Sequence, residues 1–134
     1  MESDEDRAKY HAIMDWYDLE RRKKGIDLGP IIRERLADRD TDAERIALLQ
    51  VLAWELVFRD KFAEAADTLL EWAAMEPLEP MPLISLAGQR VYHEDNPQRA
   101  LADIDRTIVL AEASGKIRRH ALNTKVRILT KLKD

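Results

Sequence analysis

The chain has 134 residues, of which 46% are hydrophobic and 36% are charged, and its formal net charge is −4. This length fits a single domain spanning residues 1–134, and the composition excludes a disordered chain. Only four glycines and few β-branched or aromatic runs argue against a sheet, so we expect an all-α protein. Without cysteine, the sequence offers neither a disulfide framework nor a thiolate metal site.

The first residues are acidic, whereas a secretory signal is basic and then apolar. No apolar run reaches the roughly 20 residues that a membrane span requires. We therefore expect a soluble, cytoplasmic protein with no membrane partner.

Charge is distributed unevenly along the chain. Residues 1–20 hold seven acids and two bases, whereas residues 116–134 hold seven bases and one acid. A basic terminal helix can bind nucleic acid, but the sequence pI near 5.5 is far below the value of about 9 that is typical of such domains. We interpret the basic end as the solvated face of the last helix and expect no nucleic-acid partner.

The first predicted helix begins after Ser3 and ends before Gly25. Three acids follow Ser3 and favour the positive end of the helix dipole, while glycine can adopt the left-handed conformation that closes a helix. One face of this helix carries Tyr10, Ile13, Met14 and Tyr17, with Trp16 and Leu19 beside it. We expect this face to dock against the next hairpin and not to form a ligand site.

Gly29-Pro30 opens a short second helix, whose apolar contacts are expected at Ile31, Ile32 and Leu36. Thr41 to Glu44 then forms a capping box for a long helix. Residues 46–77 read as a helical hairpin in which Asp60 caps the second helix. Its two apolar stripes are Ile46, Leu49, Leu52, Ala53, Leu56 and Val57, and Phe62, Ala65, Ala66, Leu69, Leu70 and Ala73.

Three prolines separate this hairpin from the next and predict an extended connector from Glu76 to Met81. The second hairpin runs from about Pro82 to Ser114 and turns at Asn96-Pro97. Its second helix carries a buried stripe of Ala100, Leu101, Ile104, Ile108 and Ala111. A final helix from Lys116 places its bases on one side and, on the other, Ile117, Ala121, Leu122, Val126, Leu129 and Leu132. We expect seven helices.

A repeat becomes visible when the sequence is shifted by 35 residues. The shift places Leu52-Ala53 on Ala87-Gly88, Ala65 on Ala100 and Leu69 on Ile104. Small side chains are needed where two helices of a pair cross closely, so small positions flanked by aliphatic ones indicate a repeated packing geometry.

These positions resemble the tetratricopeptide repeat (TPR) family, whose pattern is W-x2-L-G-x2-Y, then A-x3-F, then P. The resemblance covers residues 43–132, and it departs from the family in its longer spacing and in aliphatic residues at the aromatic positions. The first unit matches through Leu49, Leu52, Ala53, Leu56, Ala65, Leu69 and Pro77, and the second through Ile84, Ala87, Gly88, Val91, Ala100 and Ile104.

The resemblance implies a short right-handed α-solenoid of antiparallel helical hairpins. Residues 1–40 would be an N-terminal helical pair, residues 43–114 two TPR-like hairpins, and residues 116–132 a capping helix. The first helices would line a concave groove that holds a peptide or helix of a partner protein. The groove residues would be Gln50, Trp54 and Phe58, then Ser85, Gln89, Tyr92 and His93, and finally His120, Thr124 and Arg127.

The residues give no pattern of an active site. The three histidines lack the spacings that metal sites use, and Asp103 and Asp105 point about 200° apart on a helix. We expect a non-catalytic adapter without metal or cofactor. The alternative is a structural, self-associating helical domain that forms a homodimer, followed by an enzyme or a nucleic-acid binder.

Overall fold

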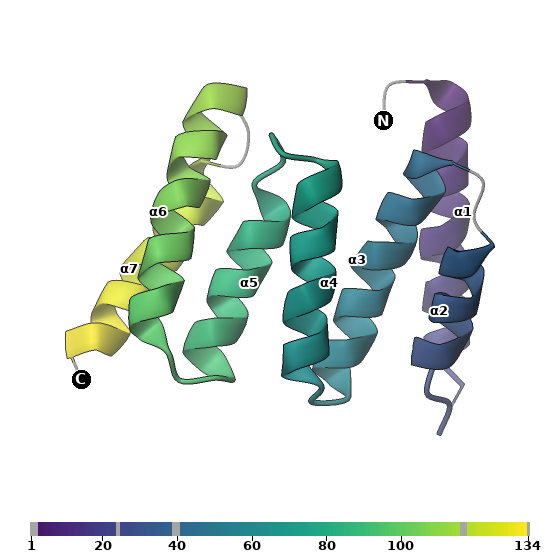
Figure 1. The fold of residues 1–134 in the computed structure, drawn as a ribbon, viewed down its shortest axis with the longest axis horizontal. Helices are drawn as coiled ribbons and strands as arrows, with labels where there is room; N and C mark the ends of the chain where they lie inside the picture. The colour runs from purple at the N-terminus through teal and green to yellow at the C-terminus, as the bar shows by residue number, and fades with distance from the viewer. Residues whose placement is uncertain (1–2, 24, 39–40, 116–117, 134) are drawn as a thin grey trace. The chain divides into compact units, whose positions relative to one another are not determined.

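The seven helices expected from the sequence are present in the computed structural model, which describes residues 3–23, 25–38, 41–115 and 118–133 (Figure 1). These ranges contain no strand, and the all-α fold class is confirmed. Lys116 and Ile117, where we expect the last helix to begin, lie outside the described residues. In chain order the helices are α1 (Asp4–Arg21), α2 (Gly29–Ala37), α3 (Asp42–Phe58), α4 (Phe62–Met75), α5 (Met81–Tyr92), α6 (Pro97–Ser114) and α7 (Arg118–Lys133).

The chain divides into two compact units, Met1–Thr68 and Leu69–Asp134, and the boundary falls inside α4. The first unit contains α1, α2, α3 and the first half of α4. The second contains the rest of α4 together with α5, α6 and α7. The single domain expected from the chain length stays a prediction.

Three helices begin at the predicted side-chain caps. The side chains of Ser3, Thr41 and Asn96 each accept a hydrogen bond from the backbone N–H three residues further on, at 3.0, 3.3 and 3.3 Å. Each bond satisfies one of the N–H groups that a helix start leaves without an intrahelical partner. Local sequence therefore fixes where α1, α3 and α6 begin.

Asp60 ends α3, whereas the sequence suggested that it caps α4. Its φ is 60°, in the left-handed region. Its N–H donates to the carbonyl of Val57 at 3.0 Å, and the N–H of Lys61 donates to the carbonyl of Leu56 at 2.8 Å. These two bonds form a Schellman motif, which usually has glycine at the left-handed position. Lys61, and not Asp60, directly precedes α4.

The connector between α4 and α5 is a turn, and the prediction of an extended segment is wrong. The N–H of Glu79 donates to the carbonyl of Glu76 at 3.0 Å. Pro77 occupies the second position of this turn, where its fixed φ fits a type I or type II turn. Pro77 therefore acts as a turn former, while Pro80 caps α5 and Pro82 lies in its first turn.

In the first unit, α1 and α2 both pack against α3. Tyr17 is buried, and Tyr10, Met14 and Trp16 pack at the edge of the core, so the predicted docking of the aromatic face of α1 is confirmed. Ile31 of α2, expected to be a core contact, is exposed. The core residues are Ile13, Tyr17, Leu28, Ile32, Ala47, Leu48, Val51, Leu52, Leu56 and Ala65.

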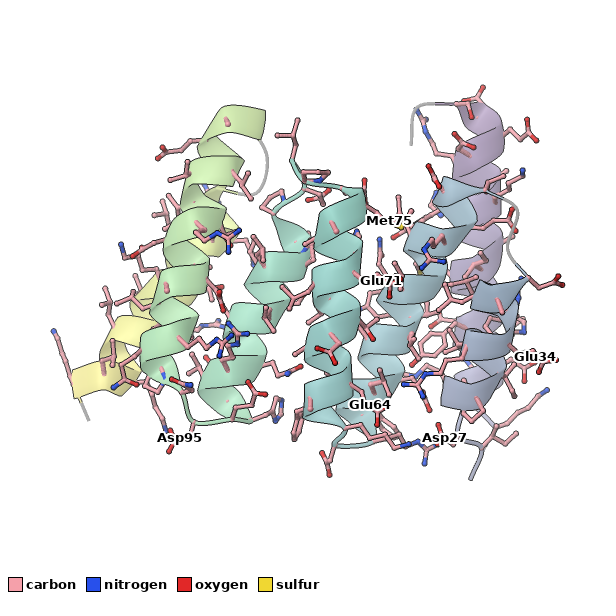
Figure 2. All side chains as sticks on the ribbon, in the orientation of Figure 1. Asp27, Glu34, Glu64, Glu71, Met75 and Asp95 are labelled. Carbon is pink, nitrogen blue, oxygen red and sulfur yellow. The ribbon has the colours of Figure 1, made fainter. Side chains whose placement is uncertain are left out.

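Two ion pairs lie on the surface of the first unit (Figure 2). One joins α4 to α2, and the other joins the turn between α3 and α4 to the loop before α2. Arg33 donates to Glu64 at 2.5 Å, and Lys61 lies 3.7 Å from Asp27. The hydrogen bond from Arg33 lowers the pKa of Glu64 below its usual value. Both pairs are solvent-exposed, so each contributes little to stability.

In the second unit, α5, α6 and α7 pack against one another. The predicted stripe of α6 is confirmed, since Ala100, Ile104 and Ala111 are buried while Leu101 and Ile108 pack at the edge of the core. The core residues are Ile84, Ala87, Val91, Ala100, Ile104, Ala121 and Ile128.

The buried face of α7 differs from the predicted one. Ala121 and Ile128 are fully buried, whereas Leu122, Val126 and Leu129 are exposed. A shift of one residue rotates the buried face by about 100°. The prediction is correct for Ala121 and Leu132, which lie in or against the core, and wrong for Leu122, Val126 and Leu129. Helix α7 carries apolar residues at helical spacing on two adjacent faces, and only the packing against α5 and α6 selects between them.

Candidate interaction surfaces

A buried carboxylate organises the first unit. Glu55 on α3 is only 3% exposed. Its Oε1 accepts a hydrogen bond from the hydroxyl of Tyr17 at 3.0 Å, and its Oε2 accepts from the N–H of Leu28 and from Nε of Arg59, both at 3.2 Å. Arg59 also donates to the carbonyl of Ile26. A buried charge needs such partners, so Glu55 connects α1, the loop before α2 and the end of α3.

The same network perturbs the titration of Tyr17. Burial, and secondly the negative charge of Glu55, raise the pKa of the Tyr17 phenol well above its usual value. Both effects disfavour the phenolate. Tyr17 therefore remains a hydrogen-bond donor to Glu55 throughout the physiological pH range.

Two aromatic side chains of α3 remain accessible above this network. Trp54 is 48% exposed and Phe58 is 65% exposed. The ring of Trp54 lies 6.3 Å from that of Tyr17, in a tilted arrangement. The guanidinium groups of Arg21 and Arg59 lie 5.9 and 5.4 Å from the centre of the Phe58 ring. We call Trp54, Phe58, Arg21 and Arg59 the aromatic surface.

A positively charged hollow of about 340 Å³ adjoins the aromatic surface. Four bases line it, together with one acid and three uncharged residues: Arg21, Arg22, Lys23 and Arg59, then Glu55, and Gly25, Ile26 and Phe58. Lys23 also pairs with Glu20 at 3.0 Å. The aromatic surface thus lies beside a concentration of positive charge, although the chain as a whole is acidic.

Gln50, the first of the predicted groove residues, is buried, and its Oε1 accepts a hydrogen bond from the hydroxyl of Tyr10 at 2.6 Å. Helix α1 therefore covers the position one turn before Trp54. The structure leaves Trp54 and Phe58 accessible and places Gln50 under α1.

The other predicted groove residues belong to the second unit. On α5, Gln89 is buried and Ser85 is half-buried, while Tyr92 and His93 are exposed at its end. On α7, His120 and Arg127 are exposed, and the Thr124 hydroxyl donates to the His120 carbonyl at 3.0 Å.

The second unit also contains an apolar cleft that the sequence did not suggest. Its volume is about 550 Å³. It carries two charged residues, Glu79 and Arg106, and otherwise Leu70, Ala73, Ala74, Pro77, Leu83, Val109 and Leu110. Leu70, which the sequence pattern placed on the apolar stripe of its helix, is exposed and lines this cleft together with Val109 of α6.

A buried ion pair connects α5 to α6. Arg90 donates to Asp103, and both residues are buried. Asp105, two residues further on, points elsewhere and pairs with Lys125 of α7 at 2.7 Å. The two acids therefore occupy different faces of α6, as their spacing predicted, and Asp103 has a structural role that the spacing alone did not reveal.

The described part of the chain offers neither a cluster of metal-ligating side chains nor a helix that could span a membrane. No group of three or more His, Cys, Asp or Glu side chains there could hold a metal ion. Within the same residues, no helix is both long and apolar enough to cross a bilayer.

Comparison of the chain with protein-family models, with curated proteins and with solved structures gives no match.

Proposed function

We propose that this protein is a non-catalytic interaction module that binds a segment of a partner protein on the aromatic surface. The exposure of Trp54 and Phe58 carries the proposal. Tryptophan is enriched among the residues that dominate binding energy, and large aromatic rings make good anchors at interfaces. Both rings stand on a helix whose end is fixed by the Glu55 network, so a partner would meet a preorganised surface.

The charge around the aromatic surface favours a partner segment that is apolar and acidic. Arg21 and Arg59 flank the Phe58 ring, and Arg22 adds a further positive charge to the adjoining hollow. Complementary charges raise specificity and the association rate more than they raise affinity. We therefore expect the aromatic rings to supply affinity and the arginines to select acidic segments.

A TPR-like solenoid is the architecture that we propose for this module. Two observations support this architecture. Helices α5 and α6 form an antiparallel hairpin, and Ala65 and Ala100, at the small positions of the repeat, are buried. In that arrangement α3, α5 and α7 are the first helices of successive units, and Tyr92 and Arg127 extend the binding groove. We also propose that the protein is cytoplasmic and that it binds no cofactor, metal or nucleic acid.

The test uses two fluorescent helical peptides, one rich in Leu and Glu and the other rich in Leu and Lys. We expect the acidic peptide to bind more tightly, and Trp54→Ala with Phe58→Ala to abolish its binding while the melting temperature is retained. Leu78→Ala removes a similarly exposed apolar side chain from the turn between α4 and α5 and serves as the matched control.

Equal binding of both peptides would contradict the charge preference. A large loss of stability in the Trp54 and Phe58 variant would show that these rings are part of the core, and the proposed function would then lose the residues on which it depends.

A further inference from the structure

The outer face of α7 carries an apolar stripe. Leu122, Val126 and Leu129 are 38%, 61% and 40% exposed, and their spacings of four and three residues place them on one side of the helix. Arg119 and Lys133 lie on the same side by helical spacing. The helix sequence contains six basic residues and no acid. The stripe is therefore apolar in its centre and positive at its edges.

The outer face of α1 has the opposite charge. Ala8, Ala12 and Leu19 are exposed and lie on the side of the helix opposite the buried Ile13 and Tyr17. This face is apolar and mostly small in its centre. The exposed acids on or beside it are Asp4, Asp15, Asp18 and Glu5, of which Glu5 pairs with Lys9 at 3.5 Å; the exposed base Arg22 lies at its C-terminal end.

We propose that the outer face of α7 binds the outer face of α1 of a second copy of this chain. The bulky side chains of Leu122 and Val126 fit the low surface over Ala8 and Ala12, since small residues let two helices approach closely. The basic residues at the edges of the α7 face then lie opposite the acidic residues of the α1 face, for example Arg119 opposite Asp15. A second copy supplies the complementary surface without a further partner.

This contact is heterologous, because two different faces meet. After one contact, a pair of copies still has one free face of each kind, so association continues into chains or closes into rings. One helix from each copy buries less area than the roughly 1,200 Å² of a stable interface, and binding is therefore weak. Trp54 and Phe58 are not involved, so the inference is independent of the proposed function.

Sedimentation velocity of the full chain over a concentration series tests this association. At low salt the average mass should rise from 15.5 kDa to at least double that value. At about 1 M salt the screening length falls to roughly 3 Å, and the mass should return to that of the monomer.

Variants locate the two faces. Val126→Glu should abolish the mass increase, whereas Val109→Glu, at a valine of α6 with similar exposure, should leave it unchanged. On the other helix, Asp15→Lys with Asp18→Lys should also abolish it. Circular dichroism confirms that each variant is folded, and Val126→Ser is a milder replacement if Val126→Glu fails to fold.

Mixing the two deficient proteins gives the decisive result. The Val126→Glu protein retains the α1 face, and the Asp15→Lys, Asp18→Lys protein retains the α7 face. Together they should form a 1:1 complex that grows no further, because each partner has only one working face.

Four outcomes would overturn the proposal. They are a constant monomer mass, an association that the α1 variant leaves intact, a loss of association in the Val109→Glu protein, and failure of the two deficient proteins to complement each other. Binding to vesicles of anionic phospholipid that is lost in the Val126→Glu protein, without any self-association, would assign the α7 face to a membrane surface instead.

Discussion

The hydroxyl of Tyr17 donates a hydrogen bond to Oε1 of Glu55 over 3.0 Å, and this bond joins α1 to α3 inside the first unit. The other carboxylate oxygen accepts from Arg59, the residue that follows Phe58. The position of an exposed aromatic ring is thus coupled to a buried charge. The residues that would bind a partner and the residues that hold the first unit together are neighbours in one network.

The raised pKa of Tyr17 predicts a loss of stability at alkaline pH. In the unfolded chain the phenol ionises near pH 10, whereas in the folded protein it stays protonated above that pH. The folded state then binds more protons than the unfolded state, so the free energy of unfolding is unaffected below pH 10 and falls as pH rises above it. Urea midpoints measured between pH 8 and pH 11 should show this decline.

The control for this prediction is Tyr17→Phe, which removes the titrating group. It should lower the free energy of unfolding at pH 8 by about 1–3 kcal/mol, because Glu55 loses a hydrogen-bond donor. Its stability should then decline less above pH 10 than that of the unchanged protein. An equal decline in both proteins would assign the alkaline loss to lysine ion pairs and not to Tyr17.

The helix boundaries were largely predictable because their causes are local. Ser3, Thr41 and Asn96 satisfy N–H groups only three residues away. Glu55 could not be recognised in the same way, since its partner Tyr17 lies 38 residues earlier in the sequence. From the sequence alone, an acid such as Glu55 on an amphipathic helix is expected to face solvent. Only its tertiary contacts make Glu55 part of the core.

The buried pair of Arg90 and Asp103 should be a major determinant of stability in the second unit. Removing Asp103 takes away the closest ion-pair partner of the buried Arg90 and leaves it the longer contact to Glu94 at 3.9 Å, so Asp103→Ala should cost about 3–5 kcal/mol. Replacing both residues, as Arg90→Met with Asp103→Leu, should recover most of this loss. Chemical denaturation of the unchanged protein and the two variants measures both effects, and a neutral Asp103→Ala variant would show that Glu94 or water compensates Arg90.

Gly88 should tolerate a side chain, although the repeat pattern assigns it to a close helix crossing. A Cβ built there would meet no atom within 4 Å, apart from the immediate chain neighbours and the backbone of its own helix. Gly88→Ala should therefore raise the free energy of unfolding by about 0.5–1 kcal/mol through better helix propensity. Gly115→Ala is the matched control, and it should destabilise because its φ of 70° disfavours a side chain. If Gly88→Ala destabilises the protein, the result would support the close helix crossing that the repeat pattern predicts at this position.

The face that α7 buries can be tested with two adjacent residues. Apolar spacing allowed either face of this helix to be buried, and the structure places Ile128 in the core and leaves Leu129 40% exposed. Ile128→Ala should lower the free energy of unfolding by about 2–5 kcal/mol, because it removes a fully buried side chain and leaves a cavity. Leu129→Ala should cost less than about 1 kcal/mol, since its side chain is already in contact with water and alanine favours the helix. Denaturant midpoints of the two variants measure this difference directly. The reverse order would mean that α7 is rotated by about 100°, with Leu122 and Leu129 in the core as the sequence pattern first indicated.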